Sequence, residues 1–216
     1  MKARQKPNSA RPTTGKSVGN QPTLAGYEVL VCISGGIAAY KTATLTSSLV
    51  QSGCGVTVAL TRNGRRFIGE TTFRALTGRP TYTNMWRRTS PVEFQHLALC
   101  ERADLILVAP ATANIIGKLA SGIADDLVST LLLGADSPVM LAPAMNTRMW
   151  LNPAVQRNIE LLRDSSIILV GPDEGWLACG DTGPGRMTEP EVLFETVSEQ
   201  LLCNPPKQRS SAVSPS

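Results

Sequence analysis

The segment Pro143–Trp150 places one amide side chain among bulky, polarizable side chains, directly after the short apolar run 139–142. Asn146 carries both N–H donors and a carbonyl acceptor, so it can bind a carboxylate while it touches the edge of a flat ligand. Met145 and Met149 are adaptable enough to pack against a flat ring or a thiol. Methionines also fill short buried helices, but a buried amide needs hydrogen-bond partners. We therefore treat all three as candidate substrate-binding residues.

Two other side chains are suited to proton transfer. His96 is the single histidine of the chain, and histidine has an unperturbed pKa that permits proton transfer near neutral pH. A lone histidine is also often only structural. Cys179 lies in the segment 175–187, which contains four glycines and a proline. Such flexible segments act as lids, so this thiol could be lowered over a site; a surface loop with an incidental cysteine is the alternative.

Small and polar residues follow two of the apolar runs. Ser34, Gly35 and Gly36 come directly after the run 27–33, and their exposed N–H groups at a helix start suit a phosphate. The spacing is not GxGxxG, so a mononucleotide phosphate fits better than a dinucleotide. A strand–helix turn that needs glycine for its geometry alone is equally compatible. Thr112 and Asn114 follow the run 104–109, where N-capping of a helix is the simpler interpretation.

The elements that must position these residues alternate along the chain. Continuous apolar runs predict strands, and helical spacing predicts the segments between them. Near-continuous apolar strands separated by helices indicate a parallel sheet covered on both faces, an α/β fold of three layers, α/β/α. Ligands of such sheets bind at the carboxyl ends of the strands, where the candidate residues lie. The predicted strands are 27–33, 56–60, 104–109, 139–142 and 167–170, and the predicted helices are 37–51, 65–77, one from about 114, and 189–202.

Composition limits the class of protein. The chain has 216 residues, which suits one domain, predicted over 25–202. Residues 1–24 predict a disordered basic tail, and 203–216 predict a second disordered tail. Of 21 basic residues seven lie in or beside these tails, which leaves 14 against 17 acidic ones. A nucleic-acid-binding face is therefore not indicated, and no apolar run is long enough to span a membrane. Five scattered cysteines without a CxxC pair predict no metal site and a reducing, cytoplasmic location.

Five segments together resemble a known family. They occur here in the order found in the homo-oligomeric flavin-containing cysteine decarboxylases, and the resemblance covers about 27–202. The five segments are SGGIAAYK, HLAL, APATAN, PAMNTRMW and ACGD. It implies a Rossmann-like or flavodoxin-like sandwich, FMN held between neighbouring subunits, and a trimer or a dodecamer of trimers. By position, it implies that His96 is catalytic, that Asn146 holds the substrate carboxylate, and that Cys179 protonates the reduced intermediate. The residues that match flavin contacts are Gly35, Gly36, Ile37, Thr61, Arg62, Asn63, Thr112, Ala113, Asn114, Ile115 and Ala144. At Ile115 the family has threonine, so this chain loses a hydroxyl there.

The resemblance also implies an activity, the FMN-dependent decarboxylation of 4'-phosphopantothenoylcysteine to 4'-phosphopantetheine in coenzyme A biosynthesis. In that family the thiol is oxidised to a thioaldehyde, carbon dioxide leaves, and the enethiolate is reduced. Many bacterial relatives carry a synthetase in the same chain, and here a separate synthetase is expected to supply the substrate. A peptidyl-cysteine decarboxylase is the first alternative, since it uses the same chemistry. A flavin prenyltransferase-like FMN-binding protein is a further alternative, but it has no use for PAMNTRMW. A non-catalytic relative could lose His96, Asn146 and Cys179, which are all present here. A dinucleotide-dependent reductase needs the GxGxxG pattern, which this chain lacks.

Overall fold

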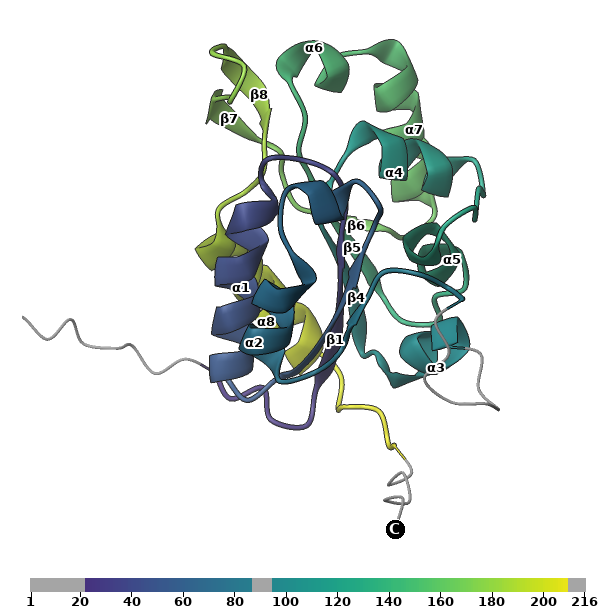
Figure 1. The fold of residues 1–216 in the computed structure, drawn as a ribbon. Coiled ribbons are helices and arrows are strands. Elements are labelled where there is room, and N and C mark those ends of the chain that lie inside the picture. Colours follow the sequence, from purple (N-terminus) through teal and green to yellow (C-terminus); the bar gives the residue numbers. More distant parts are fainter. Residues whose placement is uncertain (1–21, 87–94, 210–216) are drawn as a thin grey trace, which may run out of the picture.

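A parallel sheet forms the middle layer of the protein. The computed structural model describes residues 22–86 and 95–209, and within them the strand order is β3-β2-β1-β4-β5-β6 with helices on both faces (Figure 1). This is the order of Rossmann-like sheets, so the predicted three-layer α/β/α sandwich is confirmed. The strands are β1 (Glu28–Ile33), β2 (Gly55–Leu60), β3 (Thr81–Tyr82), β4 (Leu105–Ala111), β5 (Val139–Pro143) and β6 (Ile168–Leu169).

Two hydrophobic layers sandwich the sheet. Alternate residues of β1 face opposite sides, so Val29 and Val31 join one layer while Leu30 and Cys32 join the other. Burial on both faces explains why the strands read as continuous apolar runs. One layer is covered by α1 (Ala39–Gln51), α2 (Glu70–Thr77) and α8 (Pro190–Leu202), and the other by α3 (Gln95–Arg102), α4 (Ala113–Ala120), α5 (Leu127–Leu133) and α7 (Pro153–Asp164).

The predicted helix over 65–77 is interrupted. A 3₁₀ turn, η1 (Gly64–Arg66), comes first, and α2 starts only at Glu70. Gly69 has φ −81° and ψ 151°, an extended conformation that ends the first turn and caps the second. The break matters for the site, because it lets η1 pack against the end of β1 instead of continuing as a helix beside the sheet.

A small hairpin rises beyond the carboxyl edge of the sheet. Its strands β7 (Asp173–Trp176) and β8 (Thr182–Arg186) are antiparallel, and they stand beside the short helix α6 (Thr147–Trp150) (Figure 1). The segment 175–187, predicted as a flexible lid, therefore has its own strand pairing. Its tip contains Cys179 and Gly180, and Gly180 has φ +91°, which favours glycine.

Charged side chains hold together the amino edge of the sheet. Arg79 donates to Glu28 Oε1 at 2.9 Å, and Arg102 donates to the same oxygen at 2.8 Å. Burial alone would raise the pKa of the Glu28 carboxyl, but the hydrogen bonds from Arg79 and Arg102 outweigh it and lower that pKa to about 2. Glu28 thus stays ionised and ties β1 to two other elements.

The residues after α8 pack against this edge. Tyr27 Oη donates to the Asn204 carbonyl at 2.8 Å, the Lys207 N–H donates to Asp104 Oδ1 at 2.7 Å, and Arg209 pairs with the same carboxylate. Residues 203–209, which the sequence predicts to be part of a disordered tail, thus make defined contacts, and the bounds of the domain stay a prediction. Residues 1–21 and 210–216, which hold most of the two predicted tails, lie outside the described residues.

Among the residues that the structure describes, none of the helices is long and apolar enough to cross a membrane.

Candidate active site

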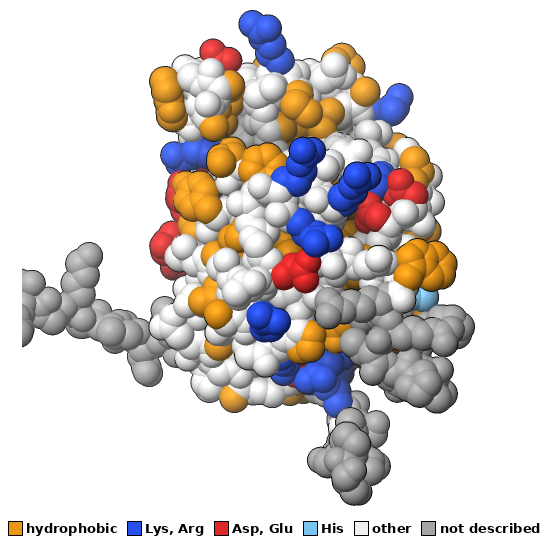
Figure 2. Space-filling model, in the orientation of Figure 1, with side chains coloured by type: hydrophobic (Ala, Val, Ile, Leu, Met, Phe, Trp, Pro, Cys, Tyr) orange, Lys and Arg blue, Asp and Glu red, His pale blue; other side chains and the backbone are white. Residues whose placement is uncertain are grey.

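A large cavity opens at the carboxyl edge of the sheet, between the loops that follow β1 and β4. The strand order reverses at this point: β2 and β3 follow β1 on one side of it, and β4, β5 and β6 are added on the other side. Such folds bind ligands where the strand order reverses. The cavity has a volume of about 1760 Å³, larger than the roughly 300–1,000 Å³ of a pocket for one small molecule. Figure 2 shows Lys and Arg side chains gathered on this face of the molecule.

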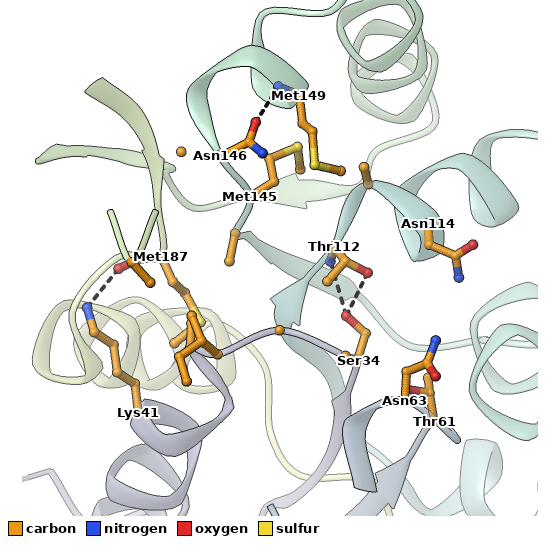
Figure 3. Close-up of a pocket in the computed structure, with 18 of the residues that line it drawn as sticks. Ser34, Lys41, Thr61, Asn63, Thr112, Asn114, Met145, Asn146, Met149 and Met187 are labelled. Atoms are coloured by element: carbon orange, nitrogen blue, oxygen red, sulfur yellow. Dashed lines mark hydrogen bonds between the residues drawn. The ribbon is translucent and has the colours of Figure 1, made fainter. Parts of the chain in front are cut away.

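The cavity brings together fourteen of the sixteen predicted site residues. Figure 3 shows how the loops after β1, β2, β4 and β5 converge around it. The residues that follow the strand ends therefore share one cavity, and their roles in binding stay a prediction. The predicted residues that line it are Gly35, Gly36, Ile37, Thr61, Arg62, Asn63, Thr112, Ala113, Asn114, Ala144, Met145, Asn146, Met149 and Cys179.

The glycine turn before α1 offers backbone donors to the cavity. Among the hydrogen bonds of the described residues, the N–H groups of Gly35, Ile37 and Ala38 have no protein acceptor. A Cβ on Gly35 would lie 2.5 Å from the Asn63 Cβ, so only glycine permits this close approach of two loops. Unpaired N–H groups at the start of a helix suit a phosphate, since the helix dipole adds to their charge.

Ser34 fixes the two loops that border the turn. Its hydroxyl donates to the Pro110 carbonyl at 2.7 Å and accepts from the Thr112 N–H at 3.1 Å, and the hydroxyls of Ser34 and Thr112 lie 3.0 Å apart (Figure 3). The ends of β1 and β4 are thus tied together through one buried side chain. The sequence pointed to Ser34 only as a turn residue, and nothing in its spacing revealed this bridge.

Asn146 has a defined orientation. It is the N-cap of α6, and its Oδ1 accepts from the Met149 N–H at 2.8 Å (Figure 3). Because the oxygen is occupied, the side-chain NH₂ group is left to serve the cavity. The capping role and a carboxylate-binding role are therefore compatible. Met145 and Met149 both line the cavity; Met145 is half-buried and also packs against the core, whereas Met149 is 43% exposed.

The hairpin is anchored at its base and carries a thiol at its tip. The Met145 N–H donates to the Gly185 carbonyl at 2.9 Å. Gly185 has φ +132°, and a Cβ there would lie 2.2 Å from the Met145 carbonyl oxygen. Cys179 is exposed, lines the cavity, and has its Sγ 3.6 Å from Asp181 Oδ2. This arrangement fixes the entry of the hairpin while its tip stays open to solvent.

Burial distinguishes the other thiols from Cys179. It raises the pKa of the Cys54 thiol to about 12 and that of the Cys100 thiol to about 11, and it also raises the pKa of Cys32. These three groups stay protonated and unreactive. Cys203 is exposed, but it does not line the cavity. Cys179 is therefore the thiol in position for chemistry at this site.

An ion-pair network that was not predicted closes one side of the cavity. Lys41 Nζ donates to Glu189 Oε1 at 2.8 Å and to the Met187 carbonyl at 3.2 Å, and Arg186 lies 3.4 Å from the same carboxylate oxygen. Lys41 lies in the first turn of α1, directly after the glycine turn, and Arg186 is the last residue of β8. The network therefore joins the glycine turn to the hairpin. Lys41 and Glu189 are 148 residues apart, so no local pattern in the chain predicts their pairing.

Two predicted site residues lie elsewhere. The side chain of Ile115 is buried in the core beneath α4, so only its backbone can contribute to a ligand site. His96 lies in the first turn of α3 and does not line the cavity. Figure 1 shows α3 near the opposite end of the molecule from the hairpin. Among the described residues no cluster of His, Cys, Asp and Glu is suited to a metal ion.

Comparison with proteins of known sequence shows extended similarity. The chain is 51% identical over 178 residues to the coenzyme A biosynthesis bifunctional protein CoaBC of Bacillus subtilis (strain 168), and the match covers 82% of this chain and 44% of that protein. The corresponding protein of Escherichia coli (strain K12) is 42% identical over 173 residues, which cover 80% of this chain and 43% of that protein. The chain thus spans less than half the length of these relatives.

Solved structures give the same result. A PPC decarboxylase mutant complexed with pantothenoylaminoethenethiol superimposes with a TM-score of 0.73 at 30% identity, over 80% of this chain and 97% of that chain. The FMN-dependent cysteine decarboxylase SpaF also superimposes with a TM-score of 0.73 at 30% identity, over 83% of this chain and 97% of that chain.

A family model described as "Flavoprotein" matches residues 18–202. This match includes the sheet, the glycine turn, Asn146 and the hairpin, and the chain belongs to the Flavoprotein family.

Proposed function

We propose that this chain is an FMN-dependent decarboxylase that converts 4'-phosphopantothenoylcysteine to 4'-phosphopantetheine. One observation carries the proposal: the free NH₂ group of Asn146 lines the same cavity as the unpaired donors of the glycine turn and the thiol of Cys179. The similarity to CoaBC proteins and to a PPC decarboxylase supports the choice of substrate.

The residues of the cavity fit FMN. The N–H groups of Gly35, Ile37 and Ala38 are placed to hold its phosphate, and the amides of Asn63 and Asn114, which have no protein partner among the described residues, can serve the polar edge of its ring. When bound, the flavin supplies reversible two-electron oxidation of the carbon that bears the substrate sulfur. Positioning and proton transfer remain for the protein.

The substrate carboxylate and the final proton have defined groups in the chain. The Asn146 NH₂ group donates to the carboxylate and orients the bond that breaks, a contribution of geometry more than of charge. After carbon dioxide leaves, the Cys179 thiol would give its proton to the enethiolate carbon that lost the carboxylate, while the carbon that bears the sulfur would receive its hydride from the bound flavin. The Cys179 thiolate would then regain a proton from solvent. The hairpin tip is open to solvent in this structure, so it would have to cover the bound substrate to keep bulk water from the carbon that Cys179 protonates, where an uncontrolled proton would end the sequence early.

A homo-oligomer would complete the site. His96 can act on the substrate only if a second copy of the chain brings its α3 to the cavity. Four large apolar side chains on the cavity lining are 43–67% exposed: Ile37, Tyr40, Met149 and Trp176. Exposed apolar groups around a site indicate that another surface covers them. The trimer or dodecamer, the catalytic role of His96, the separate synthetase and the cytoplasmic location stay predictions.

The activity can be tested directly. The purified protein should be yellow with a flavin spectrum, and it should release carbon dioxide and phosphopantetheine from phosphopantothenoylcysteine. Co-expressed chains carrying His96→Asn and Asn146→Asp, each inactive alone, should regain part of the activity if two copies share a site. A colourless protein that does not take up FMN would refute the proposal.

A peptidyl-cysteine decarboxylase is the second candidate, because the structure of peptidyl-cysteine decarboxylase EpiD is similar to this chain, with a TM-score of 0.65 at 26% identity. The two candidates differ in the group that the hairpin must admit beside the cysteine, which is either a pantothenoyl group or a peptide. Under the first proposal we expect a peptide ending in cysteine to be a poor substrate. Turnover of such a peptide faster than phosphopantothenoylcysteine would favour the second candidate.

A further inference from the structure

Most cations of the cavity are neutralised by carboxylates. Lys118 Nζ lies 2.7 Å from Asp126, and Arg65 Nε lies 3.0 Å from Glu70, in addition to the pairs around Glu189 described above. Two guanidinium groups remain. Within the ranges 22–86 and 95–209, the side chains of Arg62 and Arg66 have neither an ion pair nor a hydrogen bond, although both line the cavity. We call these two residues the arginine pair.

The backbone that carries the arginine pair is firmly held. The Thr61 N–H donates to the Ile33 carbonyl at 3.0 Å, and the Thr61 hydroxyl accepts from the Gly64 N–H at 2.9 Å. A Cβ on Gly64 would lie 2.5 Å from the Ile33 carbonyl oxygen, so η1 packs directly against the end of β1. The two charges thus have a fixed base beside the glycine turn, and their long side chains alone are adjustable.

A second, smaller cavity continues the first one on this side. It has a volume of about 570 Å³, and Arg62 and Arg65 line both cavities. Its carboxylate, Glu70, is compensated by Arg65, so the net charge that the smaller cavity offers to a ligand comes from Arg62, while Arg66 lines only the larger cavity. Figure 2 shows basic side chains clustered in the middle of this face. The other residues of the smaller cavity are Glu70, Thr83, Asn84 and Trp86.

We propose that the arginine pair binds the phosphate monoester at the far end of the substrate. This inference rests on the proposed function. Guanidinium groups bind phosphate oxygens in a bidentate manner, and two of them match the charge of a phosphate dianion. The cysteinyl and pantothenoyl groups have the length of about three residues of extended chain, roughly 10 Å. A substrate anchored at Asn146 by its carboxylate therefore ends well away from Asn146 and needs a second anion site, and the arginine pair lines the same cavity as Asn146.

FMN carries a phosphate monoester as well, and it is the competing source of the same chemistry. The glycine turn already offers three unpaired N–H groups at a helix start, which suffice for one phosphate. We therefore assign the backbone of the turn to the flavin and the arginine pair to the substrate. Under this assignment, Arg62 can contact the flavin through its backbone while its side chain holds the substrate.

The test compares two substrates on the holoenzyme, phosphopantothenoylcysteine and its dephosphorylated form, pantothenoylcysteine. The variants are Arg66→Gln, Arg62→Gln and the double variant. We expect kcat/KM for the phosphorylated substrate to fall about 10- to 100-fold for each arginine removed, the effect of losing a charged hydrogen bond. For Arg66→Gln, the kcat/KM for pantothenoylcysteine should change less than about twofold. Because Arg62 also matches a flavin contact, this expectation is not extended to the variants that contain Arg62→Gln. Arg66→Lys should retain part of the preference, because lysine supplies the charge without the bidentate geometry.

Arg163→Gln is the matched control, since Arg163 is an exposed arginine of α7 that does not line the cavity; neither substrate should be affected. Thermal unfolding and flavin content verify that each variant is folded. Equal losses for both substrates would overturn the proposal. So would weaker binding of FMN with unchanged binding of riboflavin, which would assign the arginine pair to the flavin phosphate.

The wild-type enzyme separates this inference from the proposed function. If it decarboxylates both substrates equally well, the phosphate site is refuted while the decarboxylase stands. If it decarboxylates neither, the function fails and the phosphate assignment fails with it.

Discussion

The substitution Asn146→Asp tests the site with almost no change of shape. Aspartate caps helices as well as asparagine does, so the bond from the Met149 N–H, now 2.8 Å to Asn146 Oδ1, should persist. The stability of α6 should therefore be unchanged. The group that faces the cavity changes from an NH₂ donor to a carboxylate oxygen, opposite the carboxylate of the substrate.

Two energies add in this variant. Loss of a hydrogen bond to a charged group costs about 1.5–3 kcal/mol. Two carboxylates about 4 Å apart repel each other by about 1 kcal/mol in water and about 4 kcal/mol near a protein surface. The sum of roughly 3–7 kcal/mol predicts a fall in kcat/KM of about two to five orders of magnitude. Asn146→Ser, which also keeps a capping oxygen, loses only the first part and should fall about 10- to 150-fold.

The assay measures carbon dioxide release at several substrate concentrations, with flavin content and melting temperature as checks on the folded state. Asn152 offers a matched control, because it caps α7 through a 2.9 Å bond from the Ala154 N–H and does not line the cavity. Asn152→Asp should leave kcat/KM unchanged. If Asn146→Asp retains kcat/KM within about threefold of the wild type, its amide does not hold the carboxylate and the reasoning is wrong.

Four further outcomes are expected. Cys179→Ser should still release carbon dioxide but accumulate the oxidised enethiol product, detectable by mass spectrometry; a normal rate of phosphopantetheine formation would contradict its role. Gly185→Ala should displace the hairpin, because its Cβ would lie 2.2 Å from the Met145 carbonyl, and should lower turnover roughly tenfold with flavin content unchanged. Leu107→Ala, fully buried in β4, should lower the free energy of unfolding by about 2–5 kcal/mol in denaturant titrations. The Glu28 carboxyl, with its pKa lowered to about 2 from 4.5, stabilises the fold above about pH 4.5 and loses this effect as the pH falls toward 2. Glu28→Gln should therefore lower stability at pH 7 by about 2–3 kcal/mol and reduce the acid sensitivity in that window.

The strands were predictable where both faces are buried. Residues Leu105–Val108 of β4 are fully buried, and such a run has little alternative to a central parallel strand. Shorter or one-sided elements were missed. β3 has two residues, too few for a pattern, and α5 (Leu127–Leu133) is almost continuously apolar, so periodicity cannot distinguish it from a strand. α7 (Pro153–Asp164) buries mainly Ile159 and Leu162 and reads as polar overall.

The hairpin shows a different limit. Its glycines predict flexibility, because glycine usually loosens a loop. In the structure, Gly183 and Gly185 instead permit close contact: a Cβ at Gly183 would lie 2.6 Å from the Thr147 hydroxyl, and one at Gly185 would meet the Met145 carbonyl. The same residue type serves both purposes, and only the neighbouring α6 segment decides which. Tertiary contact of this kind leaves no local trace in a sequence.

The two edges of the sheet differ in how completely their polar groups are satisfied, and this difference is itself an argument for a ligand. At the amino edge, Glu28 and Asp104 are paired with arginines. At the carboxyl edge, the amides of Asn63 and Asn114 and the guanidinium of Arg66 have no partner among the described residues, although all three line one cavity. These three side chains are exposed, so in the free protein they can bond to water and can exchange that water for a ligand. A bound molecule that satisfies them should stabilise the native state by mass action, so added FMN should raise the melting temperature of the flavin-free protein in proportion to the logarithm of its concentration.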